Sequence, residues 1–138
     1  MSRILGVDPG DVRCGVAITD SARTMAFPRP EVANGPSVVD VLGQVARDEG
    51  VSVVVVGRPR ALSGRVTQST AHADALFAAL VAALPQIKVV QWDERLTTHE
   101  AGRRMSLAGV NAREQRGRLD SAAAVVLLQS YLDAHRVG

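Results

Sequence analysis

Residues 4–20 read ILGVDPGDVRCGVAITD, and this stretch decides the fold. An apolar run ends at Asp8, a Pro-Gly-Asp turn follows, and a second apolar run returns. Two apolar runs joined by a Pro-Gly turn are typical of a β-hairpin. We therefore expect antiparallel strands at 3–8 and 13–20, with an acid where the first strand enters the turn.

The chain that follows alternates between strand and helix patterns. Residues 25–32 are extended but contain Pro28 and Pro30, which places them at a sheet edge, because proline lacks the N–H that pairs a central strand. The run 51–57 is apolar on both faces and rich in valine, which is typical of a buried parallel strand. A fifth strand is expected at 87–92. The expected helices are a segment between Pro36 and Gly50, residues 67–84, residues 97–108, and a last helix from residue 119 onward.

This order of elements predicts an α/β fold. The expected sheet is mixed and five-stranded, with three antiparallel strands followed by parallel strands and with helices on both faces. The 138 residues suit one domain spanning 1–138. No run reaches the roughly 20 apolar residues of a membrane span, and no signal-peptide core is present, so we expect a soluble cytoplasmic protein with no membrane partner. Cys14 is the single cysteine, which excludes an internal disulfide and fits a reducing compartment.

Charge and aromatic content bear on the partner. All 16 basic residues except Lys88 are arginine, and the sequence pI is near 9.3. Arginine suits phosphate oxygens, so nucleic acid is one interpretation; arginine spread over a solvated surface is the other. Aromatic residues make up only 3% of the chain, so Trp92 and Tyr131 are expected in the core rather than as platforms for stacking bases. The histidines, expected at the surface, are His72, His99 and His135.

Four acids fall where the predicted fold would place a site, at the carboxyl ends of parallel strands. Asp8 ends the first strand, Asp93 and Glu94 end the last strand, and Asp120 begins the final helix. Adjacent strand residues point to opposite faces, so only one of Asp93 and Glu94 is expected to enter the site. Clustered carboxylates suit Mg²⁺ or Mn²⁺, and two such ions about 3.5–4 Å apart can activate water and stabilise a leaving oxygen of a phosphodiester.

Each of these acids also has a structural interpretation. Asp8 is a natural turn residue before Pro-Gly. Asp93 or Glu94 can pair with Arg95 or cap the following helix, and Asp120 is a natural N-cap for a helix that begins at residue 121. The chemical interpretation therefore depends on the joint arrangement of the acids and on no single one of them.

Four blocks of the sequence together resemble the YqgF family, also called RuvX. They are residues 8–17, 56–59 with Gly64, 93–98 and 120–124. The resemblance implies a ribonuclease H-like fold and a metal-dependent nuclease that acts on Holliday junctions or on the 5′ end of the 16S ribosomal RNA precursor. It also implies that Asp8, Glu94 and Asp120 are catalytic and hold Mg²⁺ or Mn²⁺, as two ions. The chain departs from the family pattern at Arg58, where leucine is frequent, and at Ser63, where an aspartate or asparagine is common.

Arginines would hold the phosphates of such a substrate, either a four-way DNA junction or precursor ribosomal RNA. This expected set is Arg13, Arg58, Arg60, Arg95, Arg103, Arg104, Arg113, Arg116 and Arg118. A junction resolvase would be a homodimer, because symmetric cleavage of a two-fold junction needs two active sites. Two other functions remain open: a non-catalytic RNA-binding ribosome-assembly factor, and an actin-like domain whose hairpin cradles a nucleotide phosphate. The actin-like interpretation is disfavoured because those proteins clamp the nucleotide between two such domains.

Overall fold

The computed structural model describes residues 2–59, 63, 65–94 and 119–135, and for residues 119 and 120 it describes the backbone alone. The described strands are β1 (Arg3–Asp8), β2 (Arg13–Thr19), β3 (Ala26–Ala33), β4 (Val51–Arg58) and β5 (Lys88–Asp93). The described helices are α1 (Val38–Asp48), α2 (Gln68–Ala83) and α5 (Leu119–Ala134). Each lies within about two residues of its predicted range. The helix expected at 97–108 lies outside the described residues.

The five strands form one sheet in the order β3-β2-β1-β4-β5. β1 pairs with β2, and β2 with β3, in antiparallel register, whereas β4 is parallel to both β1 and β5. This arrangement confirms the predicted mixed sheet. β3 carries Pro28 and Pro30 and lies at one edge, as expected from the missing N–H groups.

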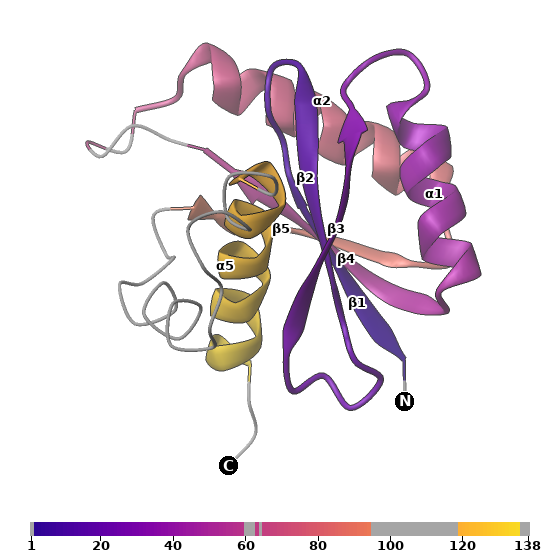
Figure 1. Cartoon of the computed structure of the whole chain (residues 1–138). Helices are drawn as coiled ribbons and strands as arrows, with labels where there is room; N and C mark the ends of the chain where they lie inside the picture. Colours follow the sequence, from indigo (N-terminus) through magenta and orange to yellow (C-terminus); the bar gives the residue numbers. More distant parts are fainter. Residues whose placement is uncertain (1, 60–62, 64, 95–118, 136–138) are drawn as a thin grey trace.

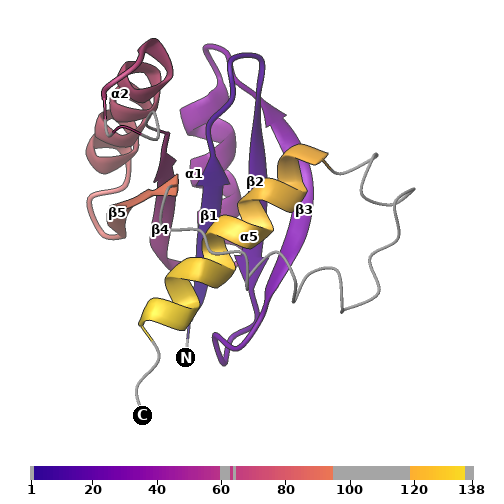
Figure 2. The same ribbon diagram turned by 90° about the vertical axis from the view of Figure 1, so that its left-hand side faces the viewer.

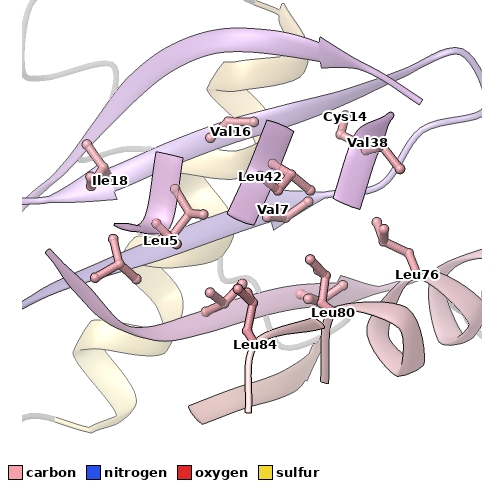
Figure 3. Close-up of a cluster of buried hydrophobic side chains, with 14 residues drawn as sticks. Leu5, Val7, Cys14, Val16, Ile18, Val38, Leu42, Leu76, Leu80 and Leu84 are labelled. Carbon is pink, nitrogen blue, oxygen red and sulfur yellow. The ribbon is translucent and has the colours of Figure 1, made fainter. Parts of the chain in front are cut away.

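Helices cover both faces of the sheet. Figures 1 and 2 show α1 and α2 on one face and α5 crossing the strands on the other. The larger core lies between the sheet and the α1/α2 pair, where Leu42 and Leu80 meet Leu5 and Val7 of the central strand (Figure 3). The second core lies under α5. Its buried members are Ile4, Ala17, Ala26, Val55, Ala124, Val125, Leu128 and Leu132.

Local sequence explains where the elements begin and end. Thr67 caps α2 through a reciprocal pair of hydrogen bonds with Thr70, which satisfies backbone N–H groups of the first turn. Gly50 follows α1 with a φ of +66°, a left-handed conformation that favours glycine. Gly6 lets α5 approach β1 closely, because a Cβ there would lie 2.9 Å from the Cβ of Leu128. Among the helices that the structure describes, none has the length and apolar character needed to cross a membrane.

Candidate functional site

β1 and β5 deliver Asp8 and Glu94 to the same edge of the sheet. Both strands are parallel to β4, which lies between them, so their carboxyl ends meet at one edge. Side chains alternate between faces along a strand, and Ile4 and Gly6 of β1 both meet the α5 side. Asp8 is the next residue of this alternation in β1. Glu94 follows the end of β5 and lies on the same side, because a Cβ at Gly57 would meet both its Oε1 and Leu127 of α5. Both acids therefore belong to the face of the sheet that α5 covers.

The two carboxyl groups contact each other. Burial, a hydrogen bond with Asp8 and the charges of Asp8 and Asp93 together raise the pKa of Glu94 from 4.5 to about 9. Two carboxylates in contact repel each other, so the folded protein holds the proton of Glu94 more tightly than a free carboxyl group would. At neutral pH and without a cation, Glu94 is the protonated partner and donates its hydrogen bond to Asp8. The pair is thus a partly buried set of carboxyl oxygens at the carboxyl edge of the sheet.

Gly57 makes the space for this pair. A Cβ at Gly57 would lie 2.9 Å from Oε1 of Glu94 and 3.0 Å from Cδ2 of Leu127 in α5. The glycine therefore leaves the volume that the Glu94 carboxyl group occupies beneath the helix. Sequence analysis placed Gly57 at the end of a strand and in a family block, but gave it no role in the site. The available signal was a glycine ending a valine run at the carboxyl edge of the sheet.

Glu94 and Asp93 have different surroundings. Glu94 contacts Asp8, whereas Asp93 pairs in register with Arg58 of β4, and its charge helps to raise the pKa of the Arg58 guanidinium. Gln91 belongs to the same face of β5 as Asp93, and it donates a hydrogen bond to Asp74 of α2. The acid that meets Asp8 is therefore Glu94, and Asp93 belongs to the face covered by α2.

The third predicted acid, Asp120, lies in the first turn of α5. The helix begins at Leu119, so Asp120 is inside it and is not its N-cap, contrary to the structural interpretation above. Its side chain lies outside the described part of the structure. Asp120 precedes Leu127 by seven residues, close to two helical turns, so both positions belong to the side of α5 that meets Gly57. Within the described residues alone, no three acidic, histidine or cysteine side chains form a metal-binding group.

Two predicted phosphate-binding arginines are described, and both are paired. Arg13 contacts Glu31 at 3.3 Å. Arg58 donates two hydrogen bonds to Asp74, at 2.9 and 3.1 Å. Hydrogen bonding between the two residues is the main cause of the raised pKa of Arg58 and of the lowered pKa of Asp74. The remaining predicted arginines lie outside the described residues: Arg60, Arg95, Arg103, Arg104, Arg113, Arg116 and Arg118.

Comparison with known proteins gives concordant results. Residues 2–134 match the RuvX family, which is described as "Holliday junction resolvase". A protein of Corynebacterium jeikeium named "Putative pre-16S rRNA nuclease" is 40% identical over 136 residues, which cover 97% of this chain and 88% of that protein. A Rubrobacter xylanophilus protein of the same name is 38% identical over 131 residues, covering 95% of this chain and 92% of the relative.

Solved structures agree on the fold. Thermus thermophilus RuvC in complex with a Holliday junction substrate superposes with a TM-score of 0.58 at 16% identity and covers 97% of this chain and 95% of its own. Fowlpox virus resolvase with its substrate Holliday junction DNA gives 0.60 at 12% identity, covering 96% and 97%. At such identities the likeness concerns the fold, and it confirms the expected ribonuclease H-like architecture. The family match and these relatives show that the chain belongs to the RuvX family.

Proposed function

We propose that this protein is a metal-dependent endonuclease that hydrolyses phosphodiester bonds in the 16S ribosomal RNA precursor, in the cytoplasm. The contact between Asp8 and Glu94 at the carboxyl edge of the sheet carries the proposal, because it brings together two carboxyl groups, the ligands that Mg²⁺ and Mn²⁺ prefer. The relatives at 38–40% identity over nearly the whole chain support the ribosomal RNA substrate through their names. The same matches favour a nuclease over the actin-like interpretation of the hairpin.

Asp8, Glu94 and Asp120 would hold Mg²⁺ or Mn²⁺, with two ions expected. The described pair fits such a group, because hard divalent cations prefer carboxylate oxygens and these two carboxyls are already in contact. Bound ions would supply the charge that activates water and stabilises the leaving oxygen. Glu94 would give up its proton on binding a cation, and Gly57 keeps the space in which its carboxyl group sits. α5 excludes water from the sheet face beneath it, which strengthens the electrostatic interactions of both acids.

The test is a cleavage assay on a precursor 16S RNA fragment, run with Mn²⁺ and with EDTA. Asp8→Asn should reduce cleavage by at least about 100-fold, on the order expected for loss of an electrostatic catalytic group, while binding of the RNA stays within a few-fold of wild type. Asp40→Asn, an exposed residue in the first turn of α1 on the other face, is the matched control. Cleavage by Asp8→Asn at the wild-type rate would refute the assignment of Asp8. Binding with no cleavage by wild type would favour the non-catalytic assembly factor.

The family description favours a second substrate, the Holliday junction. A four-way junction run in the same assay tests it directly. Symmetric resolution needs two active sites, so this function also requires a homodimer. Light scattering during size-exclusion chromatography, with and without the junction, measures that state. A protein that stays monomeric at assay concentration and cleaves only RNA would exclude the junction.

A further inference from the structure

Three rings form one cluster where β5 meets the last turn of α5. Trp92 packs edge-to-face on Tyr131, with ring centroids 5.4 Å apart and planes at 86°. His135 stacks on Tyr131 at 4.1 Å and 26°, and its centroid also lies 5.4 Å from that of Trp92. The chain has one tryptophan and one tyrosine, and both belong to this cluster.

Hydrogen bonds hold the rings in place. The Trp92 indole N–H donates to Oγ of Ser130 at 3.2 Å, and Nδ1 of His135 lies 2.8 Å from the backbone oxygen of Tyr131. Trp92 and Tyr131 border the core beneath α5 but are only half-buried, and His135 is exposed. The expectation that Trp92 and Tyr131 are core residues is therefore only partly right.

The cluster lies beside the acid pair. Trp92 precedes Glu94 by two residues, so their Cα atoms are at most roughly 7 Å apart. Tyr131 follows Leu127 by one helical turn, roughly 6 Å along α5, and Leu127 contacts the space beside Glu94. A nucleotide next to one held at the acid pair can therefore reach the rings.

We propose that Trp92, Tyr131 and His135 form a stacking site for an unpaired base that flanks the bond to be cleaved. The proposal rests on the proposed nuclease function and narrows its substrate to nucleic acid that is single-stranded beside the cleavage point. Bases stack on aromatic side chains with little regard to sequence, because every base presents a flat π-face. The outer ring, His135, is the one that an incoming base would meet first.

A purely structural role for the cluster makes different predictions. In that case the rings only tie the end of α5 to the edge strand β5, and ligand binding would be insensitive to the bases. A base-free strand of the same length and charge would bind equally well. Comparing the two ligands therefore separates the roles.

Trp92 fluorescence provides the assay, since it is the single tryptophan of the chain. The full chain is titrated in EDTA, which prevents cleavage, with a short single-stranded oligoribonucleotide and with an abasic strand of equal length. We expect the base-bearing strand to quench Trp92 and to bind about 5-fold or more tightly than the abasic strand. His135→Ala should remove about that 5-fold preference, whereas His135→Phe, which keeps a ring without the imidazole, should restore it. His72→Ala, an exposed histidine on α2 at the other face, is the control.

Equal affinity for the two strands in wild type would overturn the proposal, as would an unchanged preference in His135→Ala. The proposal would also be overturned if His135→Lys, but not His135→Phe, regained the affinity that His135→Ala loses, because the contact would then be to phosphate. Failure of the nuclease function is a separate result: base-dependent quenching without cleavage in Mn²⁺ contradicts the nuclease and leaves the stacking site supported. Cleavage without base-dependent quenching contradicts the stacking site alone.

Discussion

Substitution of Glu94 by glutamine should stabilise the metal-free protein at alkaline pH. Burial and contact with Asp8 raise the pKa of Glu94 to about 9, above its ordinary value of 4.5. Between these values the folded protein holds a proton that the unfolded chain has released, so the free energy of unfolding falls as pH rises. The destabilising contribution is absent below pH 4.5, grows through the window and is complete above pH 9. Glutamine has no such titration, and its N–H₂ group can donate to Asp8 in place of the proton.

The size of the effect follows from the width of the window. A carboxyl kept protonated from pH 4.5 to pH 7.5 costs at most about 4 kcal/mol, at 1.36 kcal/mol per pH unit. Glu94 is only partly buried, so solvent screening reduces this limit to about 1–2 kcal/mol. We therefore expect the stability advantage of Glu94→Gln over wild type to grow by about 1 kcal/mol or more between pH 5.5 and pH 8.5.

Urea unfolding in EDTA at pH 5.5, 7 and 8.5 measures this difference for wild type and Glu94→Gln. Asp40→Asn, which removes an exposed carboxylate from α1, is carried through the same series. A stability difference between Glu94→Gln and wild type that is flat or declining with pH would refute the description of Glu94 as the protonated member of the acid pair. Addition of Mn²⁺ should stabilise wild type more than Glu94→Gln, because the variant lacks one carboxylate ligand.

Two other substitutions test the surroundings of the site. Gly57→Ala should place a methyl group 2.9 Å from Oε1 of Glu94. This close contact should lower the free energy of unfolding in urea by about 1–3 kcal/mol and reduce the rate of single-turnover cleavage. Gly35→Ala is the control and should change neither quantity, because a Cβ at Gly35 would meet no described atom within 4 Å apart from its chain neighbours. Asp74→Asn should release Arg58 from its ion pair, tighten RNA binding, and steepen the dependence of log affinity on log salt by up to about 0.7, measured by fluorescence anisotropy; an unchanged slope would mean that Arg58 does not reach phosphate.

Much of the fold was predictable because its signals are local. The Pro-Gly turn after Asp8 joins two apolar runs, and Pro28 and Pro30 force their strand to an edge. Two general rules predicted that Asp8 would lie near one of Asp93 and Glu94: parallel strands end at one edge, and side chains alternate between faces. The rules left open which of the two it would be, and the family resemblance alone pointed to Glu94. Neither rule requires knowledge of any side-chain contact.

The features that were missed depend on contacts between distant segments. Arg58 is neutralised by Asp74, which α2 brings from 16 residues away, and nothing in the composition of either segment marks the pair. The ring cluster was missed for the same reason, since Trp92 and Tyr131 are far apart in sequence and meet only where α5 crosses the edge strand. A low aromatic content describes the whole chain, and it does not predict whether the few rings that are present lie together in the fold.

Two glycines explain why the acid pair has its unusual protonation. Gly6 and Gly57 lie on the neighbouring strands β1 and β4, and a Cβ at either would meet a leucine of α5 within 3.0 Å. Their absence of side chains lets the helix lie close to the sheet, and burial is the largest cause of the raised pKa of Glu94. A larger residue at either position would lift the helix, admit water and lower that pKa. The same two positions therefore set both the packing of α5 and the protonation of the acids. Substitutions that loosen the helix should make the unfolding free energy of the metal-free protein less dependent on pH, and they should weaken cation binding at the acid pair.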